Sequence, residues 1–83
     1  MTIYDTVTYC LRDGNEIVYI GTTNDPVRRL QEHQSEGKQF TKLEATSDPM
    51  TKVDAKQKER QDLAQYRKNH GGRNPKYNKD SDG

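Results

Sequence analysis

The chain has 83 residues, of which 28% are hydrophobic and 33% are charged. This length leaves room for one compact domain with a small core and marginal stability. No stretch approaches the roughly 20 apolar residues of a membrane-spanning helix, which argues against a membrane protein. Val, Ile, Leu and Tyr form short patterned runs between turn residues, so we expect a folded, soluble domain rather than a disordered segment.

The cysteine content and the N-terminus indicate a cellular setting. The single Cys10 has no second cysteine with which to form an internal disulfide. Residues 1–5 have neither the basic start nor the apolar stretch of an export signal. We therefore expect a reducing, cytoplasmic environment.

The net charge of +1 conceals an uneven distribution. Residues 1–50 hold five Lys and Arg against eight Asp and Glu, a sum of −3, whereas residues 51–83 hold nine against five, a sum of +4. A basic half suits a surface that contacts phosphate, but charge runs are as commonly solvated helix faces. Charge alone leaves both interpretations open.

The N-terminal third predicts a β-hairpin. Residues 6–11 and 17–20 are mainly β-branched or aromatic, and Asp13-Gly14-Asn15 between them supplies turn residues. If the turn centres on Gly14, Arg12 faces Glu16 and Tyr9 faces Tyr19. The two tyrosines then share one face of the hairpin.

A helix is predicted after the hairpin. Asn24 or Asp25 can cap it, and Pro26 fits its first turn because the missing N–H is not needed there. The pattern predicts a helix over residues 27–34 that ends near Gly37. Its inward-facing residues are expected to be Val27, Leu30 and Gln34.

The second half of the chain predicts a strand and a longer helix. Residues 39–46 are a weaker strand candidate, ended by Ser47-Asp48-Pro49. The helix is expected to begin near Thr51 or Val53 and to continue to about Asn69, before two glycines. Its sparse apolar positions are Val53, Leu63, Ala64 and Tyr66.

Four motifs in order resemble the GIY-YIG nuclease family. They are Tyr9 in the first strand, the run from Tyr19-Ile20-Gly21 to His33, the helical set Ala55, Glu59 and Leu63, and the closing Pro75-Lys76-Tyr77-Asn78. The resemblance covers residues 5–78 and leaves 79–83 as a loose tail of a single domain spanning 1–83. The first triplet departs from the family pattern, because Val7-Thr8-Tyr9 stands where the family shows Gly-Ile-Tyr.

The resemblance implies an α/β (α+β) domain, in which helices flank a small, mainly antiparallel sheet of about three strands. It also implies hydrolysis of phosphodiester bonds, which requires an activated water, a cation for the phosphoryl oxygens and stabilisation of the leaving oxygen. Glu59 is implied as the metal ligand of a one-metal site that holds Mg²⁺ or Mn²⁺. Outside this family context, Glu59 reads as a surface glutamate paired with Lys56 or Arg60.

The family pattern implies roles for five further residues. Tyr9 would orient or deprotonate the attacking water, and Tyr19 would bind the water or the phosphate; alternatively both tyrosines only pack. Arg29 offers a fork of donors to the phosphate, whereas Arg28 is expected to face solvent and pair with Glu32. The remaining two are His33, for proton handling or phosphate contact, and Asn78, which would fix the site by hydrogen bonds or merely form a turn.

Basic residues of the second half are expected to contact nucleic-acid phosphates. They are Lys56, Arg67, Lys68, Arg73 and Lys76, with Lys52 and Lys79 as further candidates. These features predict a metal-dependent DNA endonuclease, for which branched and nicked DNA are candidate substrates. It is expected to act alone, as a homodimer or as a module of a larger repair or mobile-element enzyme. The alternatives are a catalytically weak or inactive nucleic-acid-binding module and a protein-interaction domain.

Overall fold

Three strands and two helices form the α+β fold that the sequence predicts. The computed structural model describes residues 2–78, so the expected tail at 79–83, with Lys79, lies outside the described residues. The elements are β1 (Val7–Asp13), β2 (Glu16–Thr23), α1 (Pro26–Ser35), β3 (Lys42–Ala45) and α2 (Lys52–Asn69). The antiparallel sheet has the order β2-β1-β3.

The hairpin forms where the sequence predicts it, but its register differs from the expected one. The turn lies between Gly14 and Asn15 rather than on Gly14, and a bulge between Leu11 and Arg12 shifts the pairing by one more residue. Tyr9 therefore faces Gly21, and Tyr19 faces Leu11. The shift of two residues preserves the alternation of side chains, so Tyr9 and Tyr19 still share a face.

Both helices begin where the sequence predicts, and each has a side-chain cap. The carboxylate of Asp25 accepts a hydrogen bond from the Arg28 amide at 3.1 Å, with Pro26 at the first helical position. The hydroxyl of Thr51 accepts one from the Asp54 amide at 3.1 Å. These caps fix the first turns of α1 and α2, where the candidate site lies.

The apolar pattern of the helices predicts which side chains are buried less well than the capping residues predict where the helices begin. Val27 is 67% exposed and Val53 is 76% exposed, so both predicted core positions are wrong. Gln34 and Ala64 also face solvent. Leu63 of α2 is buried as expected, and the helices also bury His33 in α1 and Ala55 and Glu59 in α2. Two of these four side chains are ionisable, which is unusual for a core so small.

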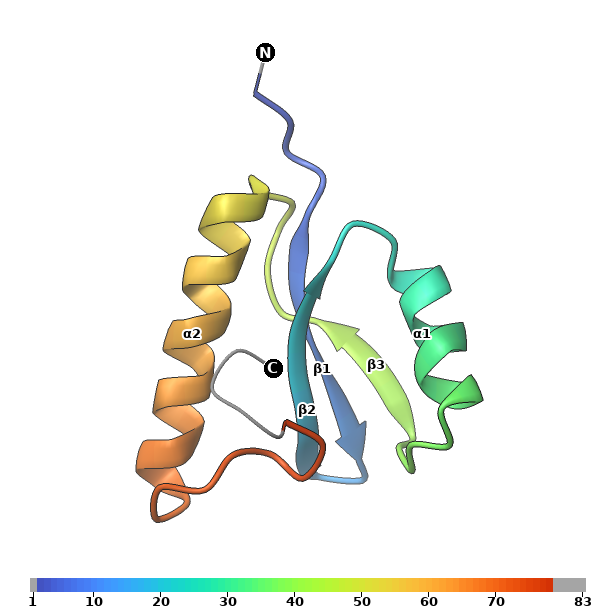
Figure 1. Cartoon of the computed structure of the whole chain (residues 1–83), viewed down its shortest axis with the longest axis vertical. Coiled ribbons are helices and arrows are strands. Elements are labelled where there is room, and N and C mark those ends of the chain that lie inside the picture. The colour runs from blue at the N-terminus through green and yellow to red at the C-terminus, as the bar shows by residue number, and fades with distance from the viewer. Residues whose placement is uncertain (1, 79–83) are drawn as a thin grey trace.

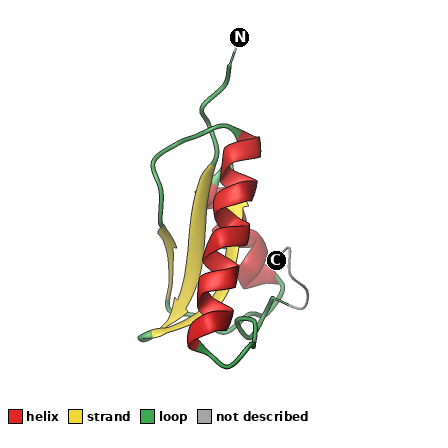
Figure 2. Cartoon of the chain, turned by 90° about the vertical axis from the view of Figure 1, so that its left-hand side faces the viewer, coloured by secondary structure: helices red, strands yellow, loops and turns green. Residues whose placement is uncertain are grey.

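The two helices cover opposite faces of the sheet (Figures 1 and 2). On one face Leu63 of α2 packs against Cys10 and Ile20. On the other, Tyr9 and Leu11 pack with Phe40 and Leu43, and His33 of α1 joins Tyr9 by a hydrogen bond. No helix within residues 2–78 is both long and apolar enough to cross a membrane.

The last described residues bind along β2 as a short extra edge. The Tyr77 amide donates to the Val18 carbonyl at 2.8 Å. The Asn78 side chain accepts from the Ile20 amide at 2.9 Å and donates to the Ile20 carbonyl at 3.0 Å. Asn78 therefore satisfies both backbone groups that Ile20 presents at this edge of the sheet.

We expect Asn78→Ala to lower the free energy of unfolding by about 2–4 kcal/mol, because it leaves two buried backbone groups of Ile20 without partners. Urea denaturation followed by circular dichroism measures this loss. Asn69→Ala is the control, since within residues 2–78 the Asn69 side chain has a single hydrogen bond, an exposed one 3.4 Å from Gln65. Equal stability of the two variants would show that the Asn78 bonds are not structural.

Candidate active site

A polar cavity of about 480 Å³ lies where the start of each helix meets the end of β2. The N-terminal segment contributes Asp5 and Thr6, and β2 with its following loop contributes Tyr19 and residues 22–24. The helices supply one carboxylate and four cations, namely Glu59, Arg28, Arg29, Lys52 and Lys56. The cavity thus places a buried acid among positive charges, a combination suited to a metal ion and a phosphate.

Glu59 is the most unusual residue of this cavity. It is 1% exposed, so the reading of Glu59 as a surface residue is wrong. Its Oε1 lies 3.4 Å from Nζ of Lys56, one helical turn earlier. Burying a carboxylate is costly unless charge or hydrogen bonds compensate, and a helix of this composition gains little stability from such a burial. The burial of Glu59 therefore has no evident benefit for stability.

Two tyrosines and a histidine form an aromatic cluster beneath the cavity. The ring centroids of Tyr9 and Tyr19 are 5.9 Å apart, and that of His33 lies 4.9 Å from Tyr19. The Tyr9 hydroxyl is 2.7 Å from Nε2 of His33. Only Tyr19 of the three lines the cavity, whereas Tyr9 and His33 are buried behind it.

Burial determines the protonation of this cluster. It raises the pKa of Tyr9 and of Tyr19, and the Arg29 guanidinium, which acts in the opposite direction on both, is the weaker influence. Burial, and then the charge of Lys38, lowers the pKa of His33. A neutral His33 that accepts a hydrogen bond from the Tyr9 hydroxyl at Nε2 carries its own proton on Nδ1. Nδ1 lies 3.5 Å from the Glu36 carboxylate and has no hydrogen-bond partner within residues 2–78.

Gly21 makes room for the tyrosines. A Cβ atom at this position would lie 2.8 Å from Cε2 of Tyr19 and 3.0 Å from the hydroxyl oxygen of Tyr9. Both distances are shorter than van der Waals contact, so any side chain here displaces the rings. The closeness of the two tyrosine rings therefore explains why a glycine follows Tyr19-Ile20 in this structure.

We expect Gly21→Ala to lower the free energy of unfolding by about 1–3 kcal/mol, the usual cost of overpacking. The midpoint of urea denaturation measures it. In a Tyr19→Leu background the same substitution should cost less, because the clashing Cε2 atom is gone. An undiminished penalty in that background would contradict the steric explanation.

The two arginines of α1 both line the cavity, but their ion pairing differs from the expected one. Nη1 of Arg29 lies 3.2 Å from Oε1 of Glu32, so Glu32 pairs with Arg29 and the expected pairing with Arg28 is wrong. Arg28 lines the cavity rather than facing solvent alone. Nε of Arg29 is buried and has no hydrogen-bond partner within residues 2–78. Arg29 thus retains a buried donor for a bound anion.

The predicted residues do not all converge. Tyr19, Arg29, Glu59 and Lys56 line the cavity, and Tyr9 and His33 support it from behind. Asn78 holds Ile20, next to Tyr19, and does not line the cavity. The other predicted basic residues lie elsewhere: Arg67 donates to Asn74, Arg73 and Lys76 line a depression at the end of α2, and Lys68 is exposed.

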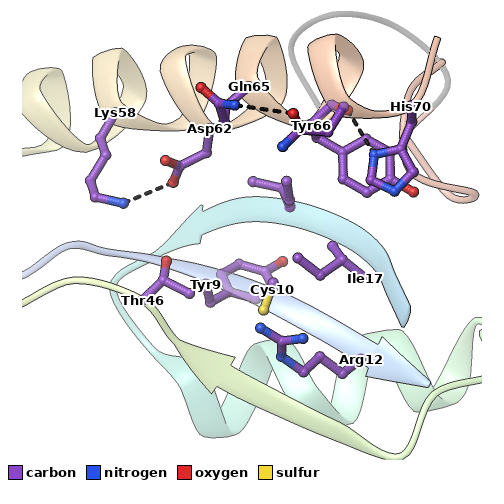
Figure 3. A pocket seen from close by; sticks show the side chains of 12 residues that line it. Tyr9, Cys10, Arg12, Ile17, Thr46, Lys58, Asp62, Gln65, Tyr66 and His70 are labelled. Atoms are coloured by element: carbon purple, nitrogen blue, oxygen red, sulfur yellow. Dashed lines mark hydrogen bonds and ion pairs between the residues drawn. The ribbon is translucent and has the colours of Figure 1, made fainter. Parts of the chain in front are cut away.

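A second cavity, of about 300 Å³, opens between α2 and the face of the sheet that α2 covers (Figure 3). Its walls include Cys10, Arg12 and Tyr66, and Lys58 pairs there with Asp62 at 2.8 Å. Of the predicted catalytic residues, only Tyr9 borders it. Tyr19, Arg29 and Glu59 line the first cavity instead.

Several cavity residues escaped the sequence analysis. They are Asp5, Thr6, Thr22, Thr23 and Asn24, together with the position of Arg28. Residues 22–24 directly follow the Tyr-Ile-Gly triplet and precede the helix cap, a place where a loop meets a helix N-terminus and polar groups face solvent. That position was the available signal. Asp5 and Thr6 carry no comparable pattern.

The donor set agrees with a hard divalent cation. Within residues 2–78, no group of three or more His, Cys, Asp or Glu side chains is placed to hold a metal. Mg²⁺ commonly binds through one or two carboxylates and keeps several waters. The single buried carboxylate of Glu59 in a roomy polar cavity fits this mode of binding.

Comparison with known proteins agrees with the residue pattern. No curated protein and no solved structure gives a significant match. Residues 6–78 match the family model described as the GIY-YIG catalytic domain. Nucleases of this family generally depend on a divalent metal, and nucleic acid is their substrate. The match spans nearly the whole chain and includes every cavity residue except Asp5, so the chain belongs to the GIY-YIG nuclease family.

Proposed function

We propose that this domain is a metal-dependent endonuclease that hydrolyses DNA phosphodiester bonds with one divalent cation, Mg²⁺ or Mn²⁺, held by Glu59. The observation that carries the proposal is the convergence of buried Glu59 with Tyr19 and Arg29 in one polar cavity. A bound cation would neutralise charge on the phosphoryl oxygens and favour ionisation of a water. The remaining roles belong to side chains of the chain itself.

Arg29 is proposed to bind the scissile phosphate. Its buried Nε and its fork of donors match the phosphoryl oxygens, and its charge stabilises the additional negative charge of the transition state. Arg28, Lys52 and Lys56 line the same cavity and would hold adjacent phosphates. A longer duplex would also contact basic residues outside the cavity, namely Arg67, Lys68, Arg73 and Lys76.

The tyrosines are proposed to handle the attacking water. Tyr19 lines the cavity and can bind the water or the phosphate directly. Tyr9 lies behind it, with its hydroxyl bonded to Nε2 of His33, so a proton that leaves the water through the tyrosines would end on His33. Asn78 would keep β2, and with it Tyr19, in place through Ile20.

The altered first triplet does not disturb this arrangement. Thr8, which takes the place of the family's isoleucine, is fully buried, and its hydroxyl lies 2.8 Å from that of Thr46. The buried hydroxyl that replaces the isoleucine side chain therefore has a hydrogen-bond partner. Cys10 is a free, buried thiol, and its burial raises its pKa, so it is expected to be unreactive.

Incubation with supercoiled plasmid tests the proposal. We expect nicked circles with Mg²⁺ or Mn²⁺ and none with EDTA, and accumulation of linear product only if a dimer or a second event cuts the other strand. Linear, nicked and branched DNA and an RNA duplex then establish the substrate. Binding that weakens steeply with salt, without cleavage under any metal, would favour a binding module instead.

A further inference from the structure

Lys56 contacts the residue that is proposed to hold the metal. The ammonium of Lys56 lies 3.4 Å from Oε1 of Glu59, and both side chains line the same cavity. The two ends of this pair differ in exposure, because Glu59 is 1% exposed and the Lys56 side chain is 45% exposed. The contact therefore links a fixed, buried carboxylate to a cation that can move into the cavity.

Helix stability does not account for this pair. Lysine precedes glutamate by three residues, whereas the favourable order on a helix places the acid first. What the pair does provide is a positive charge beside a carboxylate that is removed from water, which lowers the cost of keeping that carboxylate ionised. The contact thus acts on the charge of Glu59 rather than on the helix.

A divalent cation at Glu59 would meet the same lysine. Two positive groups that share one carboxylate repel each other, so the arriving ion competes with the ammonium. Lysine has a flexible four-carbon stem, and the half-exposed Lys56 has room to turn toward solvent or toward a bound phosphate. The competition can therefore be resolved without displacing the helix.

We propose that Lys56 is an internal counterion of Glu59 that a divalent cation must displace, and that it thereby sets the metal affinity of the site lower than Glu59 alone would give. The inference rests on the proposed function, since it takes Glu59 as the metal ligand. Lys56 is a positioning residue in this account: it acts on the metal through Glu59.

The test measures Mn²⁺ binding to the free protein by electron paramagnetic resonance, without DNA and hence without catalysis. We expect Lys56→Gln to tighten Mn²⁺ binding about three- to tenfold, the range for loss of one partly screened charge. Lys56→Glu should tighten it further, because it adds a second carboxylate one turn from Glu59. In cleavage assays, Lys56→Gln should lower the metal concentration that gives half-maximal rate.

Lys58→Gln is the matched control. It removes the same charge from the same helix, but Lys58 pairs with Asp62 at 2.8 Å and faces the second cavity (Figure 3). Its Mn²⁺ affinity should equal that of the wild type. A similar gain in both variants would mean that net charge, not the contact with Glu59, controls the affinity, and would overturn the inference.

Glu59→Gln separates this inference from the proposed function. If Glu59→Gln binds Mn²⁺ as well as the wild type, the metal site itself is misplaced and the proposed function fails. If Glu59→Gln loses Mn²⁺ but Lys56→Gln binds it like the wild type, only the role of Lys56 is overturned. Absence of detectable binding in both wild type and Lys56→Gln counts against the inference as well.

Discussion

Replacing Glu59 with glutamine is expected to lower the rate of DNA cleavage by about a thousandfold or more. Loss of one hydrogen-bond donor to a developing oxyanion already costs about 10²–10³ in rate, and Glu59 is the proposed holder of the whole cation. Glutamine keeps the shape of the side chain, so the buried site should remain packed. Single-turnover cleavage of an end-labelled duplex in Mg²⁺ measures the effect.

Binding and folding should survive this substitution. The cations that face the phosphate are unchanged in Glu59→Gln, so DNA affinity in EDTA should remain within a few-fold of the wild type. Glu44→Gln makes the same change of charge on the sheet surface, where Glu44 pairs with Arg12 and Lys42, and should cleave normally. Cleavage by Glu59→Gln at the rate of Glu44→Gln would remove Glu59 from the mechanism.

Arg29→Ala is expected to lower the cleavage rate by about 10²–10³, with a much smaller effect on stability. The reason is that Arg29 is 38% exposed and contributes a buried donor to the cavity rather than core packing. Arg29→Lys should recover only part of the rate, because an ammonium restores the charge but not the planar fork. Single-turnover rates and thermal melting of each variant provide the comparison.

Arg12→Ala is the control for Arg29. It removes an arginine that is also engaged in an ion pair, at 3.1 Å with Glu44, but on the face of the sheet away from the proposed site. If Arg12→Ala and Arg29→Ala slow cleavage equally, the loss reflects net charge or folding, and Arg29 has no special role in the transition state.

The strands and helix starts could be predicted from sequence because their signals are local. Asp25 before Pro26 and Thr51 at the second helix each supply a cap within three residues of the amide that they bind. The hairpin register was harder to predict, since no turn residue marks the bulge between Leu11 and Arg12 in the pairing of β1 with β2. An off-centre turn and a bulge together moved the partner of Tyr9 from Tyr19 to Gly21.

Burial along the helices could not be predicted from apolarity in so polar a chain. The core of α2 uses Ala55, Glu59 and Leu63 at spacings of four, while Val53 faces water. The family pattern marked Glu59, yet only the fold shows that its charge is withdrawn from solvent. Similarly, Arg28 and Arg29 are adjacent in sequence, and the path of α1 decides that both border the cavity.

The central claim is that Glu59, Tyr19 and Arg29 jointly bind a cation and a phosphodiester. The most direct measurement is a crystal structure with Mn²⁺ and a duplex that resists hydrolysis, read from the anomalous scattering of the metal. The account predicts a Mn²⁺ peak about 2.1 Å from a Glu59 carboxylate oxygen, with a phosphate against Arg29 and Tyr19. A phosphate bound instead near Arg73 and Lys76, with no metal at Glu59, would contradict it.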